Sequence, residues 1–158
     1  MEFTTLKTLT DGIIDLVVEF HYNGHGNYGV LPFYGCGIYL AGAPVKVGNL
    51  TLRIQPTRPN PREIEQLLYE GNIGYSIFEP YRGKGYAGRA CKLAAKIARQ
   101  HALTELLINY NVENKASMRV IEKLGAQKVK EFDTPASHLD ENDPTPRRAQ
   151  FRWRIDAE

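Results

Sequence analysis

The stretch that most constrains the fold is residues 77–98, IFEPYRGKGYAGRACKLAAKIA. A strand pattern runs here into a glycine-rich turn, and the turn opens a segment in which small and apolar residues recur at helical spacing. The face that we expect to pack on a sheet consists of Ala90, Leu93, Ala94, Ile97, Ala98 and His101. Because a strand that leads directly into an amphipathic helix needs a sheet for the helix to cover, the pattern predicts an α/β domain.

The glycine turn in this stretch has the composition of a phosphate-binding loop. Gly83 and Gly85 allow the backbone to approach a ligand without side chains in the way. The free N–H groups of the loop and first helical turn, with the positive end of the helix dipole, form an anion site. Arg82 and Lys84 add positive charge beside it. The sequence therefore suggests a phosphate bound at the start of this helix.

The same turn has other interpretations. A glycine turn between a strand and a helix is common, and such a turn often has a purely structural role without any ligand. Gly83, Gly85 and Gly88 also match the dinucleotide pattern G-x-G-x-x-G, but no acidic residue ends the next strand to hold a ribose. The mostly β first half also offers no repeated βαβ unit. A Walker loop is excluded because no Gly-Lys-Ser/Thr triplet occurs.

Strands and turns dominate the first half of the chain. Runs rich in β-branched or alternating apolar residues predict strands at 12–22, 34–41, 45–54 and 71–78. Residues 23–29 predict a glycine- and asparagine-rich loop, and residues 55–63, with three prolines, predict an exposed loop. Residues 64–70 carry no decisive pattern.

The second half alternates strands and helices. An apolar strand is predicted at 105–112, followed by a helix that Asn114 caps and Gly125 ends. A strand at 126–133, a polar loop and a final alternating strand at 147–155 complete the chain. The order β-β-β-β-α-β-α-β-β predicts one α/β domain over residues 1–158, built on a mixed sheet.

The composition is that of an ordinary globular domain. Its 158 residues, 42% of them hydrophobic and 24% charged, can bury a single core. No apolar run approaches the roughly 20 residues needed to cross a bilayer, and the N-terminus lacks a secretory signal pattern, so we expect no membrane partner. Cys36 and Cys91 lie far apart, so we expect reduced thiols in a cytoplasmic protein, with neither a disulfide nor a zinc site.

The formal net charge of +2 conceals an uneven distribution. Residues 1–80 hold 5 Lys/Arg against 8 Asp/Glu, residues 81–130 hold 11 against 3, and residues 131–158 hold 4 against 7. A basic middle in an acidic frame favours a small polyanion at one place and a cationic second substrate elsewhere, although many lysines simply solvate helix faces. Because the basic stretch has few aromatic residues to stack on bases, we expect no nucleic-acid partner.

The segment Arg82-Gly-Lys-Gly85-Tyr-Ala87 resembles the Q/R-x-x-G-x-G/A signature of the GNAT N-acetyltransferase superfamily. The resemblance runs from about Val45 to Asp133, where the helix after the signature, the strand LLINYNV and the segment NKASMRVIEKLGA follow the family's order. The last segment is similar to the Asn-x-x-Ser…Glu-Lys-x-Gly pattern of the Rim-like branch. The resemblance implies a single-domain GNAT fold, a mixed central sheet with splayed strands flanked by helices. The two N-terminal helices usual in the family find no match, so we expect them to be reduced or absent.

The resemblance also implies a site for acetyl-CoA, the co-substrate, and no metal. Free backbone groups of the splayed strand at Ser76, Ile77 and Phe78 would pair with the pantetheine arm. The N–H of Ile77 would bind the acetyl carbonyl and stabilise the oxyanion that develops when an amine attacks the thioester.

The pyrophosphate of the coenzyme would lie on the backbone of the signature loop. That loop consists of Arg82, Gly83, Lys84, Gly85, Tyr86 and Ala87. Asn114 matches the family's asparagine that binds the coenzyme arm from the far side, a role that is compatible with capping its helix. Ser117, one helical turn further on, would face the same arm.

Two positions depart from the family's catalytic pattern. Many relatives use a glutamate and a tyrosine for proton transfer, and this sequence has Asn109 and Ile121 at the matching places. Neither side chain transfers protons. Glu70, just before the splayed strand, is our candidate for the general base, with a solvated turn carboxylate as the alternative.

Other ionisable residues are weaker candidates. His21 and His25 flank a glycine loop and can titrate near neutral pH, and Asp15 and Glu19 lie on the first predicted strand. His101 is expected in the core. Most of the tyrosines are expected to pack, with one of them able to supply a phenol: Tyr34, Tyr39, Tyr69, Tyr75 and Tyr110.

These features predict an N-acetyltransferase that moves the acetyl group of acetyl-CoA to a small-molecule or peptide amine. Direct transfer in a ternary complex is expected, because neither cysteine is placed as a nucleophile. The alternative is a non-catalytic acyl-CoA-binding module or sensor of the same fold, which Asn109 and Ile121 favour. A dinucleotide-binding oxidoreductase is a more distant alternative. We also expect that the strand FRWRI can pair across a homodimer.

Overall fold

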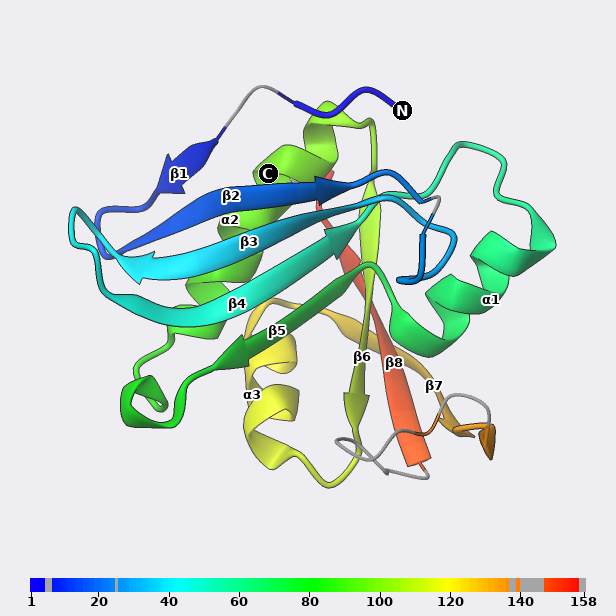
Figure 1. Ribbon diagram of the computed structural model, residues 1–158. Helices are drawn as coiled ribbons and strands as arrows, with labels where there is room; N and C mark the ends of the chain where they lie inside the picture. The colour runs from blue at the N-terminus through cyan, green and yellow to red at the C-terminus, as the bar shows by residue number, and fades with distance from the viewer. Residues whose placement is uncertain (5–6, 25, 137–138, 140–146, 157–158) are drawn as a thin grey trace.

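The computed structural model describes residues 1–4, 7–24, 26–136, 139 and 147–156. Eight strands form one sheet in the order β1-β2-β3-β4-β5-β6-β8-β7 (Figure 1). Neighbouring strands are antiparallel except β5 and β6, which are parallel. The strands are β1 (Thr8–Thr10), β2 (Ile14–Tyr22), β3 (Phe33–Leu40), β4 (Lys46–Arg53), β5 (Ile73–Ile77), β6 (Glu105–Asn111), β7 (Gln127–Asp133) and β8 (Arg147–Arg154).

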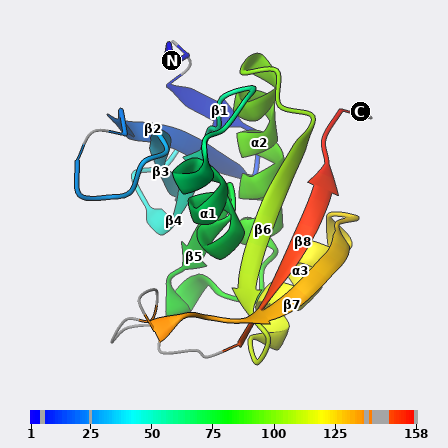
Figure 2. The same cartoon turned by 90° about the vertical axis from the view of Figure 1, so that its right-hand side faces the viewer.

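Helices lie on both faces of the sheet. The helices α2 (Tyr86–Gln100) and α3 (Lys115–Lys123) cover one face, and α1 (Pro61–Glu70) lies against the other beside β6 (Figures 1 and 2). A short 3₁₀ turn, η1 (Glu79–Tyr81), leads from β5 toward α2. The predicted α/β fold with a mixed sheet is therefore confirmed.

The main core lies between the sheet and α2. The α2 residues Leu93 and Ile97 are almost fully buried, as are Leu16 on β2 and Leu52 on β4. Burying each such aliphatic side chain stabilises the fold by about 1.5–3 kcal/mol. His101 was expected in this core, and that expectation is wrong. The imidazole is only half-buried at the end of α2, where Nε2 lies 2.6 Å from the hydroxyl of Tyr34.

Helix α1 corrects the end of the loop predicted at residues 55–63, since residues 55–60 are a loop and the helix begins at Pro61. Asn60 caps the helix through Oδ1, which accepts a hydrogen bond from the N–H of Glu63, and the Glu63 carboxylate accepts one from the N–H of Asn60. Pro61 is tolerated because the first residue of a helix has no intrahelical partner for its N–H. The helix ends at Gly71, whose positive φ of 71° suits glycine.

The N-terminal part of the described chain contains one strand that the sequence analysis did not predict. It is the short strand β1, and no helix precedes Pro61 among the described residues. The strand β8, which contains most of FRWRI, is paired on one side with β6 and on the other with β7. The pairing with β7 extends over Arg147–Arg152 and that with β6 over Arg148–Arg154, so Trp153 and Arg154 pair with β6 alone, and pairing of FRWRI across a dimer stays a prediction. Within the described chain, no helix is long and apolar enough to span a membrane.

Candidate functional site

The sheet opens between β5 and β6. Along their described lengths these two strands share a single paired position, Ile73 with Ile108, and then diverge (Figure 1). Asn72 closes the narrow end of the split. It donates from N–H to the carbonyl of Leu107 at 2.7 Å, and its Oδ1 accepts from the N–H of Leu107 at 2.8 Å. On the other side, its carbonyl accepts from the N–H of Arg53 at 2.6 Å, so one buried residue joins β4, β5 and β6.

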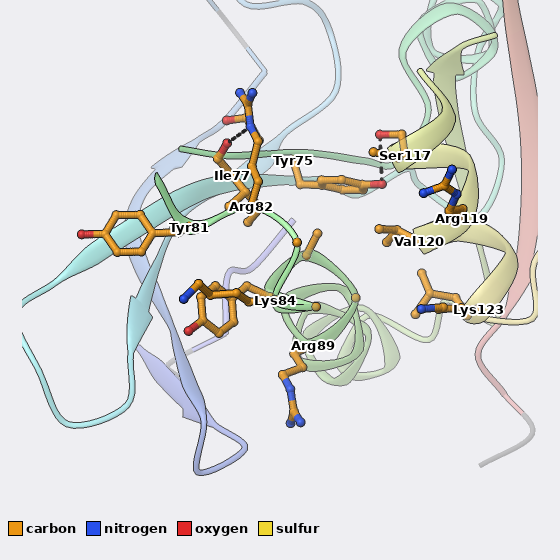
Figure 3. A pocket seen from close by; sticks show the side chains of 18 of the residues that line it. Tyr75, Ile77, Tyr81, Arg82, Lys84, Arg89, Ser117, Arg119, Val120 and Lys123 are labelled. Atoms are coloured by element: carbon orange, nitrogen blue, oxygen red, sulfur yellow. Dashed lines mark hydrogen bonds between the residues drawn. The ribbon is translucent and has the colours of Figure 1, made fainter. Parts of the chain in front are cut away.

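The open edge of β5 carries backbone groups that do not pair with a neighbouring strand. Phe78 donates its N–H to the carbonyl of Val47 at 2.8 Å, which places these two residues in a hydrogen-bonded antiparallel pair. Because successive residues of an antiparallel strand alternate in direction, Ile77 turns its N–H and C=O away from β4 and toward the split. The side chain of Arg82 donates from Nε to the Ile77 carbonyl at 2.9 Å (Figure 3). The direction of the Ile77 backbone is the one expected for a donor to a ligand in the split.

A cavity of about 870 Å³ lies beside the open edge of β5, on the side of α2 and α3. Its walls are the end of β5, the loop of residues 81–85, the first turns of α2 and one face of α3 (Figure 3). This volume is within the range of pockets for small-molecule ligands.

The glycine loop forms one end of this cavity. Gly83 and Gly85 have φ angles of 80° and 79°, which glycine adopts without strain. A Cβ atom added at either position would meet no atom within 4 Å, so open space faces the loop. Gly85 begins α2 without a side-chain cap, and the first helical N–H groups therefore remain available to an anion.

Positive charge surrounds the cavity. Six basic residues are among those that line it: Arg82, Lys84, Arg89, Lys92, Arg119 and Lys123. Asp11, in the turn between β1 and β2, adds a carboxylate that lies 2.9 Å from Nη1 of Arg89. Burial opposes ionisation of Asp11, but hydrogen bonds from the backbone of Ile14 and Ile13 and from Arg89 outweigh it and lower the pKa of this carboxyl. The balance of charge suits a polyanion.

Most residues of the predicted coenzyme site line this one cavity. Those that do are Ser76, Ile77, Arg82, Gly83, Lys84, Gly85, Tyr86, Ala87, Asn114 and Ser117. Phe78 does not line the cavity, and 39% of this residue is exposed to solvent. Asn114 caps α3 by accepting the N–H of Ser117 at 3.0 Å, as its sequence position predicted.

The cavity also contains two cations that the sequence analysis did not single out, and Tyr75, which it named only among the tyrosines able to supply a phenol. Arg119 and Lys123 lie four residues apart on α3, a spacing that places two cations on one helix face. Tyr75 lies two residues before Ile77 on β5, so the period of a strand puts both side chains on one face. Its hydroxyl donates to Oγ of Ser117 at 3.2 Å. The four-residue spacing on α3 and the two-residue spacing on β5 are visible in the sequence and could have indicated that these residues share a face with the site.

The two positions that depart from the family's pattern have structural roles. Asn109 donates from Nδ2 to the carbonyl of Leu68 at 2.8 Å and accepts from Gln150 at 3.0 Å. It therefore holds α1 against the sheet. Ile121 is fully buried in the core cluster and is absent from the cavity lining.

Glu70, the predicted base, lies at the end of α1. Its Oε2 accepts from Nε2 of Gln66 at 2.7 Å and lies 3.4 Å from Nε of Arg53. The carboxylate is on the face of the sheet opposite α2 and does not line the large cavity. With 43% of its side chain exposed, it is open to solvent.

The other predicted ionisable candidates have local partners. His21 stacks on Phe3 with a centroid separation of 4.2 Å, and Glu19 accepts hydrogen bonds from Tyr39 and Lys46 at 2.8 Å each. Asp15 accepts the N–H of Gly42 at 3.0 Å. His25 lies outside the described residues.

A smaller hollow of about 180 Å³ is lined by residues of β4 and β5, including Asn49, Thr51 and Gly74. Asn49, Thr51 and Ser76 alternate with buried residues that face α2, so they mark the opposite face of the sheet. Tyr75 and Ser76 line both this hollow and the large cavity. The two spaces therefore lie on opposite faces of the same strand, β5.

The site contains neither a metal cluster nor a reactive thiol. No group of three or more His, Cys, Asp or Glu residues that could hold a metal occurs among the described residues. Cys36 and Cys91 are free and buried, and burial raises the pKa of each thiol to about 12. Both thiols therefore stay protonated at neutral pH and are poor nucleophiles.

Residues 17–127 match the sequence profile of the acetyltransferase (GNAT) domain. Since the match covers more than half of the chain, the chain belongs to the GNAT acetyltransferase domain family. It is similar to the uncharacterized N-acetyltransferase YycN of Bacillus subtilis (strain 168), with 29% identity over 83 residues, which are 52% of this chain and 49% of YycN. The chain thus spans about half the length of that relative.

Solved structures share the fold. The ribosomal-protein-S5-alanine acetyltransferase of Vibrio fischeri superposes with a TM-score of 0.61 at 19% identity, over 79% of this chain and 63% of that one. RimL, a ribosomal L7/L12 alpha-N-protein acetyltransferase in complex with coenzyme A, superposes with a TM-score of 0.60 at 19% identity, over 80% and 64%. The chain covers less than two thirds of either structure.

Proposed function

We propose that this protein transfers the acetyl group of acetyl-CoA to a primary amine, directly within a ternary complex. The observation that carries the proposal is the junction of the open β5 edge with the glycine loop in one cavity of about 870 Å³. Membership of the GNAT family supports the acetyl-transfer chemistry. RimL, which has the same fold, is a ribosomal L7/L12 alpha-N-protein acetyltransferase whose structure holds coenzyme A.

The residues present fit the coenzyme. The pyrophosphate would accept hydrogen bonds from the loop of residues 82–87, where open space faces Gly83 and Gly85. The pantetheine arm would run along the edge of β5 and pass Asn114 and Ser117 on α3. The N–H of Ile77, which points into the split, would bind the acetyl carbonyl and stabilise the developing oxyanion.

The acceptor amine would approach from the opposite face of the sheet. The hollow beside Asn49 and Thr51 shares Tyr75 and Ser76 with the large cavity, so an amine bound there would lie beside the strand that holds the thioester. Glu70 lies on this same face beside Arg53, two residues after Thr51 on β4. It would draw the proton from the attacking ammonium through ordered water.

The acceptor belongs to the class of small-molecule or peptide amines. A peptide amine agrees with the protein acceptors named for the two solved relatives. We place the reaction in the cytoplasm, where buried reduced thiols such as Cys36 and Cys91 are stable. A homodimer would use an edge strand, β1 or β7, or the end of β8 at Trp153 and Arg154, which is paired with β6 alone.

The experiment that tests the function has two steps. Calorimetry first measures the affinity for acetyl-CoA, and a thiol-release assay then follows CoA production over a panel of peptide, lysine, polyamine and small-molecule amines. Amine-dependent thiol release supports the proposal. Absence of acetyl-CoA binding would exclude it, and a thermal-shift comparison of CoA with NAD would then test the dinucleotide alternative.

The second candidate function is a non-catalytic acyl-CoA-binding module. The structural roles of Asn109 and Ile121 favour it, because they remove the family's usual proton-transfer groups from the site. Binding of acetyl-CoA without thiol release for any amine would support this alternative.

A further inference from the structure

The phenol of Tyr75 lies in the candidate site and is carried by strand β5. Its side chain leaves β5 on the face of α2 and α3, and its hydroxyl reaches Oγ of Ser117 on α3 at 3.2 Å. Figure 3 shows the ring lying across the cavity between the strand and the helix. Both residues line the cavity.

Tyr75 is the tyrosine nearest the position proposed for the thioester. Tyr81 and Tyr86 also line the cavity, but they belong to the η1 turn and the start of α2, at the end assigned to the pyrophosphate. Tyr75 and Ile77 are alternate residues of one strand face, about 7 Å apart along the backbone. A phenol at Tyr75 therefore lies within a side-chain length of a group bound at the Ile77 N–H.

The reaction needs a proton donor at this place. When the amine nitrogen bonds to the carbonyl carbon, the C–S bond breaks and its electron pair goes to sulfur, which must be protonated to leave as a thiol. Ile121, at the family's tyrosine position, is fully buried and has no proton to give. The hydroxyl of Ser117 is one helical turn from Ile121 and already accepts from Tyr75.

We propose that Tyr75 is the general acid, an inference that rests on the proposed acetyl transfer. Its Oη–H bond breaks and the proton passes to the sulfur of the leaving coenzyme. The proton lost by the amine nitrogen goes to Glu70 and then to solvent. The phenolate of Tyr75 regains a proton from solvent through the hydroxyl of Ser117, so each turnover leaves both side chains as they began.

The surroundings of Tyr75 suit this role. Burial raises the pKa of Tyr75 to about 12, and the hydrogen bond to Ser117 opposes that rise only in part. The phenol therefore keeps its proton at neutral pH, as a donor to the leaving sulfur must.

The first test compares Tyr75→Phe with a matched control. The variant keeps the ring and removes only the hydroxyl, so acetyl-CoA affinity by calorimetry should stay within about threefold of wild type. Loss of a general acid typically lowers the rate by about 10²–10⁴, so kcat should fall at least tenfold. Tyr110→Phe removes a hydroxyl from a buried tyrosine on β6 that does not line the cavity, and its kcat should stay within twofold. If the wild type is active and Tyr75→Phe keeps kcat within threefold of the wild-type value, Tyr75 is not the general acid.

The second test does not depend on turnover. With CoA bound, a Tyr75 hydroxyl that donates to sulfur stabilises the thiolate, so Tyr75→Phe should raise the pKa of the bound thiol. Ultraviolet absorbance of the thiolate, followed through a pH titration, measures this shift, and an unchanged titration would overturn the contact. A wild type that binds CoA but releases no thiol with any amine defeats the proposed function instead. Ser117→Ala should lower kcat less than Tyr75→Phe does. If Ser117→Ala leaves kcat unchanged, the hydroxyl of Ser117 does not relay the proton to Tyr75.

Discussion

Gln150 on β8 donates from Nε2 to Oδ1 of Asn109 on the adjacent strand β6 at 3.0 Å. The two amides then reach the same helix, because Asn109 donates to the carbonyl of Leu68 at 2.8 Å and Gln150 lies 3.2 Å from that oxygen. Gln150 is 4% exposed, so these hydrogen bonds are shielded from water. Asn109, which the sequence resemblance aligns with a glutamate of many relatives, therefore attaches α1 to the sheet.

Asn109→Glu should therefore lower stability without creating a base. A carboxylate at this position cannot donate to Leu68, and it would face a carbonyl oxygen in a half-buried place. Leaving such a group without its partner costs about 1–3 kcal/mol. Chemical denaturation monitored by circular dichroism measures the free energy of unfolding.

The matched control for this change is Asn49→Glu. Asn49 is exposed on β4, so the same substitution there should alter the free energy of unfolding by less than about 0.5 kcal/mol. A stable Asn109→Glu protein with higher kcat/KM than wild type would contradict the structural role of Asn109.

Gly85→Asp should weaken acetyl-CoA binding at least tenfold, about 1.4 kcal/mol. The new carboxylate would occupy the open space that faces the loop and would repel the pyrophosphate. Gly42→Asp is the control for backbone strain, since Gly42 also has a positive φ, of 70°, and open space around it but lies outside the cavity lining. Calorimetry should show unchanged affinity for the Gly42 variant. Equal affinities of the two variants would show that the loop does not hold the coenzyme.

Asp11 and Arg89 provide a test of charge in the cavity. Asp11→Asn removes the carboxylate and releases Arg89, so CoA should bind more tightly, with a gain that shrinks as salt rises. Calorimetry at two ionic strengths measures the effect. Weaker binding by the variant would mean that Asp11 contacts the coenzyme favourably.

The same variant has a defined dependence of stability on pH. Because the pKa of Asp11 is lowered in the folded protein, its ionised form stabilises the fold above the usual value of 3.8, and this contribution is lost as pH falls through the folded pKa. Asp11→Asn should be less stable than wild type near neutral pH, by no more than about 1 kcal/mol for a partly exposed ion pair. The two proteins should converge in acid, and a difference that stays constant down to pH 2 would contradict the assignment.

Local patterns carried the prediction of the phosphate loop and its helices. The loop at Gly83 and Gly85, the α2 face and the Asn114 cap all depend on residues within a few positions of one another. Helix α1 was missed because prolines suggest a loop, although Asn60 and Glu63 have the spacing of a capping box. The role of Asn109 could not be predicted, since its partner Gln150 is 41 residues away and the pairing depends on the order of strands β6 and β8.

Glu70 is the remaining test of proton transfer. Its carboxylate accepts from Gln66 and lies beside Arg53, so the position is fixed while 43% of the side chain faces solvent. Glu70→Gln keeps the shape and removes the basicity, and loss of a general base usually costs about 10²–10⁴ in rate. We expect kcat/KM near neutral pH to fall at least tenfold and the acid limb of the pH profile to disappear. Glu65→Gln, an exposed change on the same helix, should leave both unchanged. If Glu70→Gln keeps wild-type kcat/KM and the same acid limb, the carboxylate serves only the ion pair with Arg53, and the attacking amine must lose its proton to another group.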